Sequence, residues 1–134
     1  MNSQRPLILV VDDEAHIRHV LRLKLSGEGY RVSTAGDGIE AIEKSLAEQP
    51  ALIITDFKMP FMSGLEFCLA LRSNENTSHI PVMMLTARGF SLSSDKIKKA
   101  GVSCMLSKPF SPGEIVDRVR EIAGDPLCSM EAFG

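Results

Sequence analysis

Residues 7–13 read LILVVDD, so that five apolar positions run directly into a pair of carboxylates. A second, mostly apolar run at residues 51–55 ends at Asp56, and a third at residues 102–106 is followed closely by Lys108. Short continuous apolar runs are typical of strands buried on both faces of a parallel sheet. The carboxyl ends of such strands meet at one edge of the sheet, where ligands bind. We therefore expect three carboxylates and one ammonium group to share a crevice there.

The predicted cluster of Asp12, Asp13 and Asp56 carries a physical cost. Like charges about 4 Å apart repel by roughly 4 kcal/mol at an effective dielectric constant near 20. A cation that sits between the carboxylates removes this cost. Mg²⁺ takes oxygen ligands and retains water and phosphate in its coordination shell. The sequence therefore predicts Mg²⁺ as the cofactor.

The composition limits the classes of protein to which the chain can belong. Its 134 residues suffice for one domain with a core of its own. With 15 Lys+Arg against 17 Asp+Glu, no overall field attracts it to nucleic acid or to a membrane, so we expect proteins or small anions as partners. Its three cysteines show no C-x-x-C spacing, which indicates reduced thiols. No apolar segment has the length of a signal peptide or a membrane span, and we expect a cytoplasmic protein.

Strand-like and helix-like segments alternate along the chain. Apolar periodicity and helix-stop residues predict a helix at 15–26, a strand at 31–35 and a further strand at 80–85. An N-cap residue followed three positions later by Glu, the capping-box pattern, begins the next helices at Asp37, Ser63 and Ser111, and a less regular helix is expected at 94–100. Such alternation favours right-handed crossovers and a doubly wound α/β domain. Residues 125–134 are expected to form a tail, because they have no helical period.

Four motifs together resemble the receiver domain of two-component response regulators, over residues 6–124. The motifs are Asp12-Asp13; Asp56 with Met59-Pro60 and Gly64 downstream; Thr86-Ala87; and Lys108-Pro109-Phe110. The resemblance implies a flavodoxin-like, five-stranded parallel sheet with strand order 2-1-3-4-5. It also implies that residues 1–124 are the receiver domain, and that the Lys108–Pro109 peptide bond is cis.

By the same resemblance, a phosphohistidine on a sensor histidine kinase or a histidine phosphotransfer protein phosphorylates Asp56 in the presence of Mg²⁺. The chain would then be a phosphoacceptor that assists its own phosphorylation and dephosphorylation rather than an enzyme, with a downstream protein as its target. Asp13 would bind the metal directly, Asp12 would hold it through water, and the Lys58 carbonyl would complete the protein ligands. The other implied roles are a point charge on the phosphoryl group for Lys108, a hydrogen bond to it for Thr86, and space for it beside Ala87.

Three further features concern regulation. Receivers usually carry Tyr or Phe at the position of Met105, so that the ring movement that accompanies the Thr86 switch is missing here. The long basic residues Lys58 and Arg88 occupy positions that tune the lifetime of the phosphate in similar receivers.

The apolar residues of the first helix spread over a wider part of the helix surface than one core-facing stripe needs. The surface expected to meet a partner comprises Ile17, Val20 and Pro109.

Two other functions are weighed against this one. A receiver-like scaffold would bind its partner without phosphorylation, and Met105 keeps that alternative open. A flavin-binding carrier of the same fold class needs a Ser/Thr/Gly-rich phosphate loop after the first strand, where residues 12–14 are acidic and would repel a phosphate. Taken singly, the acids are also ordinary helix-start or strand-end residues, and only their joint spacing favours the receiver.

Overall fold

The computed structural model of the protein describes residues 5–87 and 94–126, along which five strands alternate with five helices. The strands are β1 (Leu7–Val11), β2 (Arg31–Ala35), β3 (Leu52–Asp56), β4 (Val82–Thr86) and β5 (Val102–Ser107). The helices are α1 (Ala15–Gly27), α2 (Gly38–Glu48), α3 (Gly64–Ser73), α4 (Ser94–Ala100) and α5 (Pro112–Ala123).

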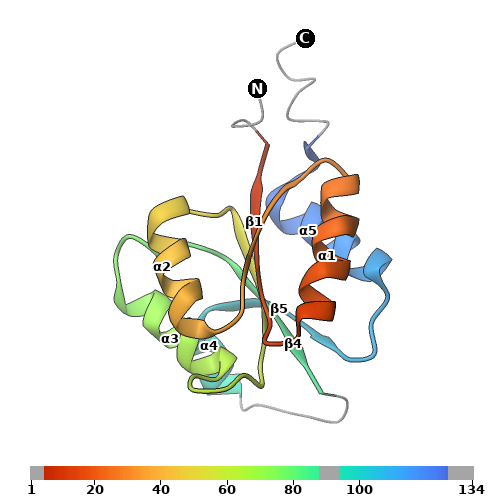
Figure 1. The fold of residues 1–134 in the computed structure, drawn as a ribbon. Coiled ribbons are helices and arrows are strands. Elements are labelled where there is room, and N and C mark those ends of the chain that lie inside the picture. The colour runs from red at the N-terminus through yellow and green to blue at the C-terminus, as the bar shows by residue number, and fades with distance from the viewer. Residues whose placement is uncertain (1–4, 88–93, 127–134) are drawn as a thin grey trace.

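The strands form one parallel sheet in the order β2-β1-β3-β4-β5, which confirms the predicted topology. Helices α1 and α5 cover one face of the sheet, and α2, α3 and α4 cover the other (Figure 1). The register aligns the carboxyl ends of the three central strands, since Val11 pairs with Thr55 and Asp56 pairs with Leu85. Thr86 likewise pairs with Ser107 on β5, so the residues that follow β1, β3, β4 and β5 come out at the same edge.

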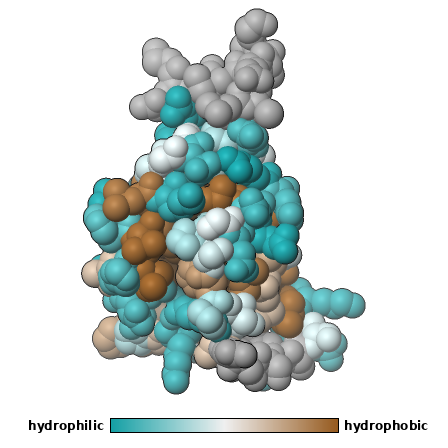
Figure 2. Space-filling view, turned by 90° about the vertical axis from the view of Figure 1, so that its right-hand side faces the viewer, coloured by the Kyte–Doolittle hydropathy of each residue, from teal (hydrophilic) through white to brown (hydrophobic). Residues whose placement is uncertain are grey.

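The apolar run of β1 is continuous because both of its faces are buried. Ile8 and Val10 belong to the hydrophobic cluster under α1 and α5, whereas Leu9 and Val11 belong to the cluster under α2, α3 and α4. Successive side chains thus point alternately into the two clusters, as expected for a strand in a sheet that is covered by helices on both faces. The outer surface over α1 and α5 is mostly hydrophilic with separate apolar areas (Figure 2).

The predicted capping boxes are complete at two of the three helices. Ser63 and Ser111 each accept a hydrogen bond from the backbone N–H of the Glu three residues on, and each Glu carboxylate accepts one from the backbone N–H of its Ser. At α2, Asp37 accepts from the Glu40 N–H, but the Glu40 carboxylate accepts from the Gly36 N–H, 2.8 Å away. Glu40 therefore ties the start of the β2–α2 loop to the helix instead of closing a capping box with Asp37.

Some boundaries differ from those expected. The strand predicted at 80–85 begins at Val82, because the Ile80 N–H donates to the Thr77 carbonyl and belongs to the turn before the strand. Helix α1 extends to Gly27, one residue beyond the predicted end. Of the predicted tail, Pro126 is buried beside Gly29, and residues 127–134 lie outside the described part.

No helix in the described ranges is long and apolar enough to cross a membrane.

Candidate functional site

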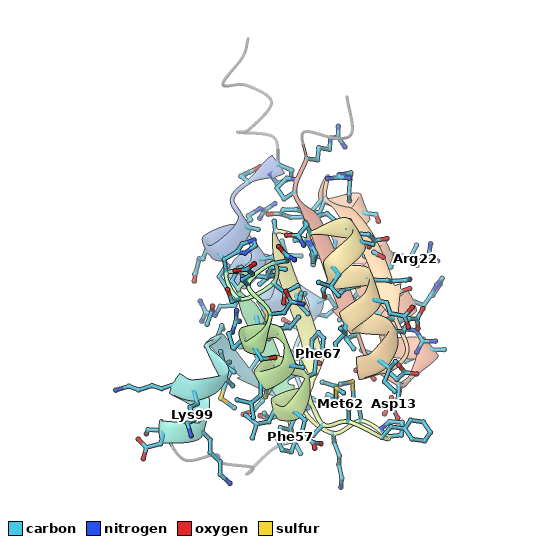
Figure 3. The ribbon with its side chains drawn as sticks, turned by 90° about the vertical axis from the view of Figure 1, so that its left-hand side faces the viewer. Asp13, Arg22, Phe57, Met62, Phe67 and Lys99 are labelled. Atoms are coloured by element: carbon cyan, nitrogen blue, oxygen red, sulfur yellow. The ribbon has the colours of Figure 1, made fainter. Side chains whose placement is uncertain are left out.

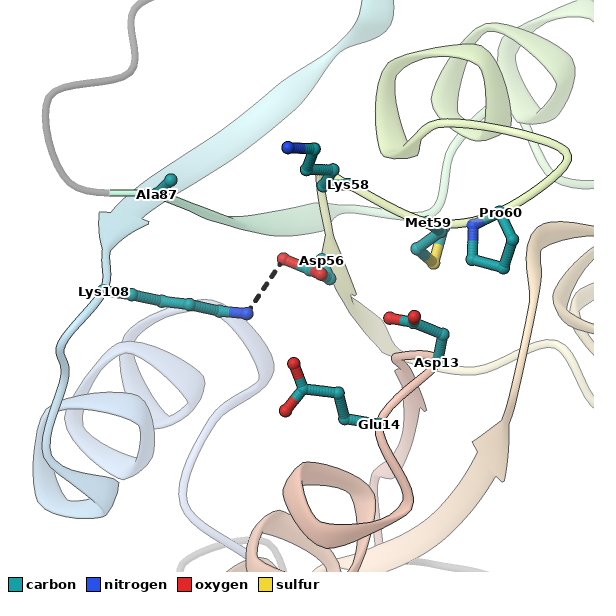
Figure 4. A pocket seen from close by; sticks show the side chains of 8 residues that line it. All are labelled: Asp13, Glu14, Asp56, Lys58, Met59, Pro60, Ala87 and Lys108. Atoms are coloured by element: carbon teal, nitrogen blue, oxygen red, sulfur yellow. Dashed lines mark ion pairs between the residues drawn. The ribbon is translucent and has the colours of Figure 1, made fainter.

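A pocket of about 530 Å³ opens at the carboxyl edge of the sheet. Its lining comes from the loops that follow β1, β3, β4 and β5, as the sequence predicts. The lining residues are Asp13, Glu14, Asp56, Lys58, Met59, Pro60, Ala87 and Lys108. In Figure 4, the carboxylates of Asp13, Glu14 and Asp56 and the ammonium group of Lys108 point into one common space.

Three carboxylates in this region lie close enough to hold one cation. Asp12, Asp13 and Asp56 each offer an oxygen atom, and these three atoms lie within 4.8 Å of one another. Asp12 and Asp56 are buried, at 1% and 7% exposure, whereas Asp13 faces solvent at the mouth. The predicted cluster of three carboxylates is therefore present at the predicted edge.

Asp12 has one oxygen atom without a protein partner in the part of the chain that the structure describes. Its N–H donates to the Ala35 carbonyl over 3.2 Å, and its Oδ1 accepts from the Glu14 N–H over 2.9 Å. Its buried Oδ2 has no hydrogen-bond partner among the described residues. Burial raises the pKa of Asp12 from 3.8 to about 6. A buried carboxylate oxygen with no donor is costly unless a cation or an ordered water satisfies it, so the donor set fits a hard cation such as Mg²⁺.

Lys108 forms an ion pair with Asp56, with 3.1 Å between Nζ and Oδ1. Burial raises the pKa of Asp56, although the Lys108 ammonium opposes this shift. Burial alone would lower the pKa of Lys108, but the hydrogen bond and charge of Asp56 outweigh it, so that the pKa of Lys108 is raised and the side chain stays charged. The Lys108–Pro109 peptide bond is cis, as the resemblance implied, and the Lys108 N–H donates to the Thr86 carbonyl.

Thr86 and Gly64 complete the surroundings of Asp56. Thr86 is buried at the end of β4, and its hydroxyl donates to the Leu106 carbonyl on β5 over 3.4 Å. Gly64 packs directly beneath the β3–α3 loop, where a Cβ atom would lie 2.5 Å from the Asp56 carbonyl oxygen. Figure 3 shows Phe57 and Met62 of this loop at the same end of the domain as Asp13. Only glycine permits this approach of α3 to the end of β3.

The remaining predicted residues lie away from the pocket or outside the described structure. Met105 does not line the pocket; it is half-buried on β5 and packs against the core cluster under α2, α3 and α4. Ile17 and Val20 on α1 are half-buried, and Ile17 packs against the cluster under α1 and α5. Pro109 is exposed, and Arg88 is outside the described residues.

Three pocket residues were given no role in the site from the sequence, namely Glu14, which was noted only as one of three acids, and Met59 and Pro60, which were noted only as motif residues. Glu14 is the N-cap residue of α1, yet its side chain makes no capping hydrogen bond. Its carboxylate is therefore left to face the pocket beside Asp13. Its position directly after two site carboxylates was the available signal, but it is equally typical of a helix-start acid.

Comparison with known proteins relates the chain to one family. Residues 8–120 match the family model described as the response regulator receiver domain. The transcriptional regulatory protein ResD of Bacillus subtilis is 43% identical over 115 residues, which make up 86% of this chain. These residues make up 47% of ResD, so the chain spans about half the length of this relative.

Two solved structures show the same fold. The chemotaxis response regulator CheY4 of Vibrio cholerae superimposes with a TM-score of 0.81 at 33% identity, covering 88% of this chain and 98% of that one. The receiver domain of the sensor histidine kinase PA1611 from Pseudomonas aeruginosa gives 0.80 at 28% identity, covering 90% and 98%. That structure holds a magnesium ion in its active site cleft.

Proposed function

The chain belongs to the response regulator receiver domains, and from this premise we propose that it is a phosphorelay receiver that accepts a phosphoryl group on Asp56. One observation carries the proposal. Asp56 lies in a pocket within reach of two further carboxylates, and its Oδ1 is 3.1 Å from the Lys108 ammonium. Phosphoryl transfer needs a positioned nucleophile, a metal-binding group and fixed positive charge, and this pocket offers all three.

In the proposed reaction, a carboxylate oxygen of Asp56 attacks the phosphorus of a phosphohistidine. The phosphorus–nitrogen bond breaks, its electron pair returns to the imidazole, and an acyl phosphate forms on Asp56. Lys108 supplies positive charge to the phosphoryl oxygens as its ion pair with the carboxylate is replaced. The Thr86 hydroxyl turns from the Leu106 carbonyl to donate to a phosphoryl oxygen, and the small side chain of Ala87 leaves room for the group.

The cation belongs to the same proposal. Asp13, Asp56 and the Lys58 carbonyl are the expected direct ligands, and Asp12 acts through water. A bound Mg²⁺ would supply positive charge that offsets the negative charge of the donor and acceptor oxygens. The unpartnered Oδ2 of Asp12 and the cluster of three carboxylates support this assignment.

The lifetime and consequences of phosphorylation are assigned to residues around the pocket. Lys58 lines the pocket with an exposed side chain, and together with Arg88 it is expected to control the access of water to the acyl phosphate. Thr86 is the proposed switch residue, and Met105 replaces the aromatic partner that receivers usually have. On this view the chain is a phosphoacceptor that assists its own phosphorylation and dephosphorylation, and it does not turn over another substrate.

The proposed phosphodonor is a sensor histidine kinase or a histidine phosphotransfer protein, and the proposed target is a downstream protein. Ile17, Val20 and Pro109 are the residues expected to meet the partner.

We retain residues 1–124 as the receiver domain and 125–134 as a tail. The expectation that no nucleic acid is contacted gains no support from the comparisons, because ResD is a transcriptional regulatory protein.

Acetyl phosphate tests the proposal without a kinase. Intact mass should show one phosphate adduct on the wild-type protein in Mg²⁺, and no adduct in EDTA or on Asp56→Asn. An adduct that forms equally well on Asp56→Asn would place the phosphate elsewhere. A wild-type protein that gains no adduct in Mg²⁺ would favour the alternative, a scaffold that binds its partner without phosphorylation.

A further inference from the structure

Arg18 contacts the backbone of the acidic site from outside the pocket. It is the fourth residue of α1, and its guanidinium Nη1 donates to the backbone carbonyl oxygen of Asp12 over 2.6 Å. Arg18 does not line the acidic pocket. It lines a separate hollow on the side of β2, with Ala15, His19, Arg22 and Thr34. The Arg18 guanidinium therefore contacts the site through a backbone carbonyl oxygen.

This hydrogen bond completes the set of contacts that fix Asp12. The N–H of Asp12 is held by the Ala35 carbonyl, and its Oδ1 by the Glu14 N–H. With Arg18 on the carbonyl oxygen, Oδ2 is the one polar atom of Asp12 left without a partner among the described residues.

The carbonyl that Arg18 holds belongs to the peptide group between Asp12 and Asp13. That group is planar, so a hydrogen bond that fixes the oxygen also fixes the N–H and hence the direction in which Asp13 leaves the chain. The Glu14 side chain adds no capping bond to this turn, which is held by the Asp12 Oδ1–Glu14 N–H bond and by the Arg18 contact. The Arg18 contact therefore restricts the backbone from which two of the three carboxylates, those of Asp12 and Asp13, extend.

We propose that Arg18 is a positioning residue for the cation site, which holds the Asp12–Asp13 peptide so that both carboxylates face one ion. The inference rests on the proposed function only in that Mg²⁺ binds at this pocket. For the Mg²⁺ affinity of a variant that lacks the Arg18 charge, the inference predicts a change opposite in sign to that expected from simple electrostatics. Removal of a positive charge near a cation site should tighten Mg²⁺ binding by Coulomb's law, whereas loss of positioning should weaken it.

The experiment is a Mg²⁺ titration followed by amide NMR on the full chain. The variants are Arg18→Gln, Arg18→Met, Arg18→Lys and the control Arg22→Gln. Arg22 lies on the same helix, farther from the Asp13 end of the domain (Figure 3), and its side chain contacts the exposed ring of His19. The control therefore removes one positive charge from α1 without touching Asp12. Thermal unfolding in EDTA reports the stability of each variant separately.

We expect Arg18→Gln and Arg18→Met to weaken Mg²⁺ binding about tenfold, as loss of a residue that orients metal ligands typically does. Arg18→Lys keeps a donor for the Asp12 carbonyl and should restore affinity to within about threefold of wild type. Arg22→Gln should leave the affinity unchanged or slightly tighter.

Unchanged or tighter binding in Arg18→Gln, with a native spectrum, would overturn the proposal. If both Arg18→Gln and Arg18→Met fail to fold, the role of the residue is structural and the proposal is equally overturned. Failure of the wild-type protein to bind Mg²⁺ would reject the cation site and with it the proposed function. Mg²⁺ binding without phosphorylation of Asp56 by acetyl phosphate would reject the proposed function alone.

Discussion

At the scale of one residue, the ionised carboxylate of Asp12 lowers the stability of the folded protein because it is buried. Burial raises the pKa of this carboxyl from 3.8 in the unfolded chain to about 6 in the folded protein. The folded protein therefore binds the proton more tightly than the unfolded chain does. Below pH 3.8 both states are protonated and the cost is absent; as the pH rises from 3.8 to about 6, the folded state loses stability.

The first prediction is that Asp12→Asn stabilises the metal-free protein at neutral pH. One pKa unit corresponds to about 1.4 kcal/mol, so the full cost above pH 6 is about 3 kcal/mol. Urea unfolding in EDTA at about pH 7 should show Asp12→Asn to be more stable than wild type by roughly this amount, and the gain should vanish near pH 4. An equal difference at both pH values would mean that the charge of Asp12 is not its cause.

Lys58 allows a second prediction at this scale. Its exposed side chain lines the pocket beside Asp56, where it can obstruct water without being needed for transfer. Lys58→Ala should therefore shorten the half-life of phosphorylated Asp56 by more than it slows loading from acetyl phosphate. The control is Lys99→Ala, an exposed lysine on α4 that does not line this pocket. If the half-life is the same in wild type and both variants, Lys58 is simply a solvated side chain.

The residues predicted for the pocket and those missed differ in a physical way. Asp12, Asp13, Asp56 and Lys108 could be found because each follows an apolar strand, and parallel strands bring their ends together. The contact of Arg18 could not be found in this way. The contact joins a side chain to a backbone carbonyl. In the sequence, an arginine on a helix that makes such a contact looks the same as an arginine that lies in solvent.

At the scale of elements, Arg72 joins the end of α3 to two other segments. Its guanidinium donates to the carbonyl oxygens of Ser78 and Ile80 before β4, and to those of Ala100 and Gly101 between α4 and β5. Gly101 has a φ of +67°, and a Cβ atom there would lie 2.5 Å from the Arg72 Nε. The α4–β5 turn is thus shaped around the guanidinium.

The third prediction is that Arg72→Lys destabilises the fold by about 2 kcal/mol, because one ammonium cannot reach carbonyls that the planar guanidinium serves in several directions. Urea unfolding at neutral pH measures the change. Arg22→Lys is the matched control, since Arg22 contacts an exposed His19 ring, and it should change stability by less than about 0.5 kcal/mol. Equal stability of Arg72→Lys and wild type would show that the carbonyls are satisfied as well by water.

The elements themselves could largely be predicted because their signals are local. Ser63 and Ser111 begin helices with complete capping boxes, and the buried strands read as apolar runs. The start of β4 could not be predicted from the apolar pattern, because Ile80 is buried in a turn held by Thr77 rather than in the sheet. A core residue in a turn and a core residue in a strand look alike in sequence.

At the scale of the whole molecule, the pocket lies at one end of the sheet and a set of tertiary contacts fixes the other. The Tyr30 hydroxyl donates to the Gly124 carbonyl over 2.6 Å, and Arg120 pairs with Glu28. These contacts join the α1–β2 turn to the end of α5. If Asp56 is phosphorylated as proposed, the Thr86 hydroxyl links the pocket to β5, because it contacts the Leu106 carbonyl and Met105 is the residue before Leu106.

The fourth prediction concerns Met105, which packs half-buried against the core where receivers usually carry an aromatic ring. Methionine adapts to irregular gaps and does not enforce two discrete ring positions, and a phosphoryl group shifts an equilibrium only through its differential interaction with the two states. Beryllofluoride, a phosphoryl mimic, should therefore change the amide NMR shifts strongly near Asp56, Thr86 and Lys108 but weakly around Met105 and α4. Met105→Tyr should strengthen this remote response, whereas the control Met105→Leu should not. Equally large shifts along α4 in wild type and Met105→Tyr would show that the protein switches fully without the ring.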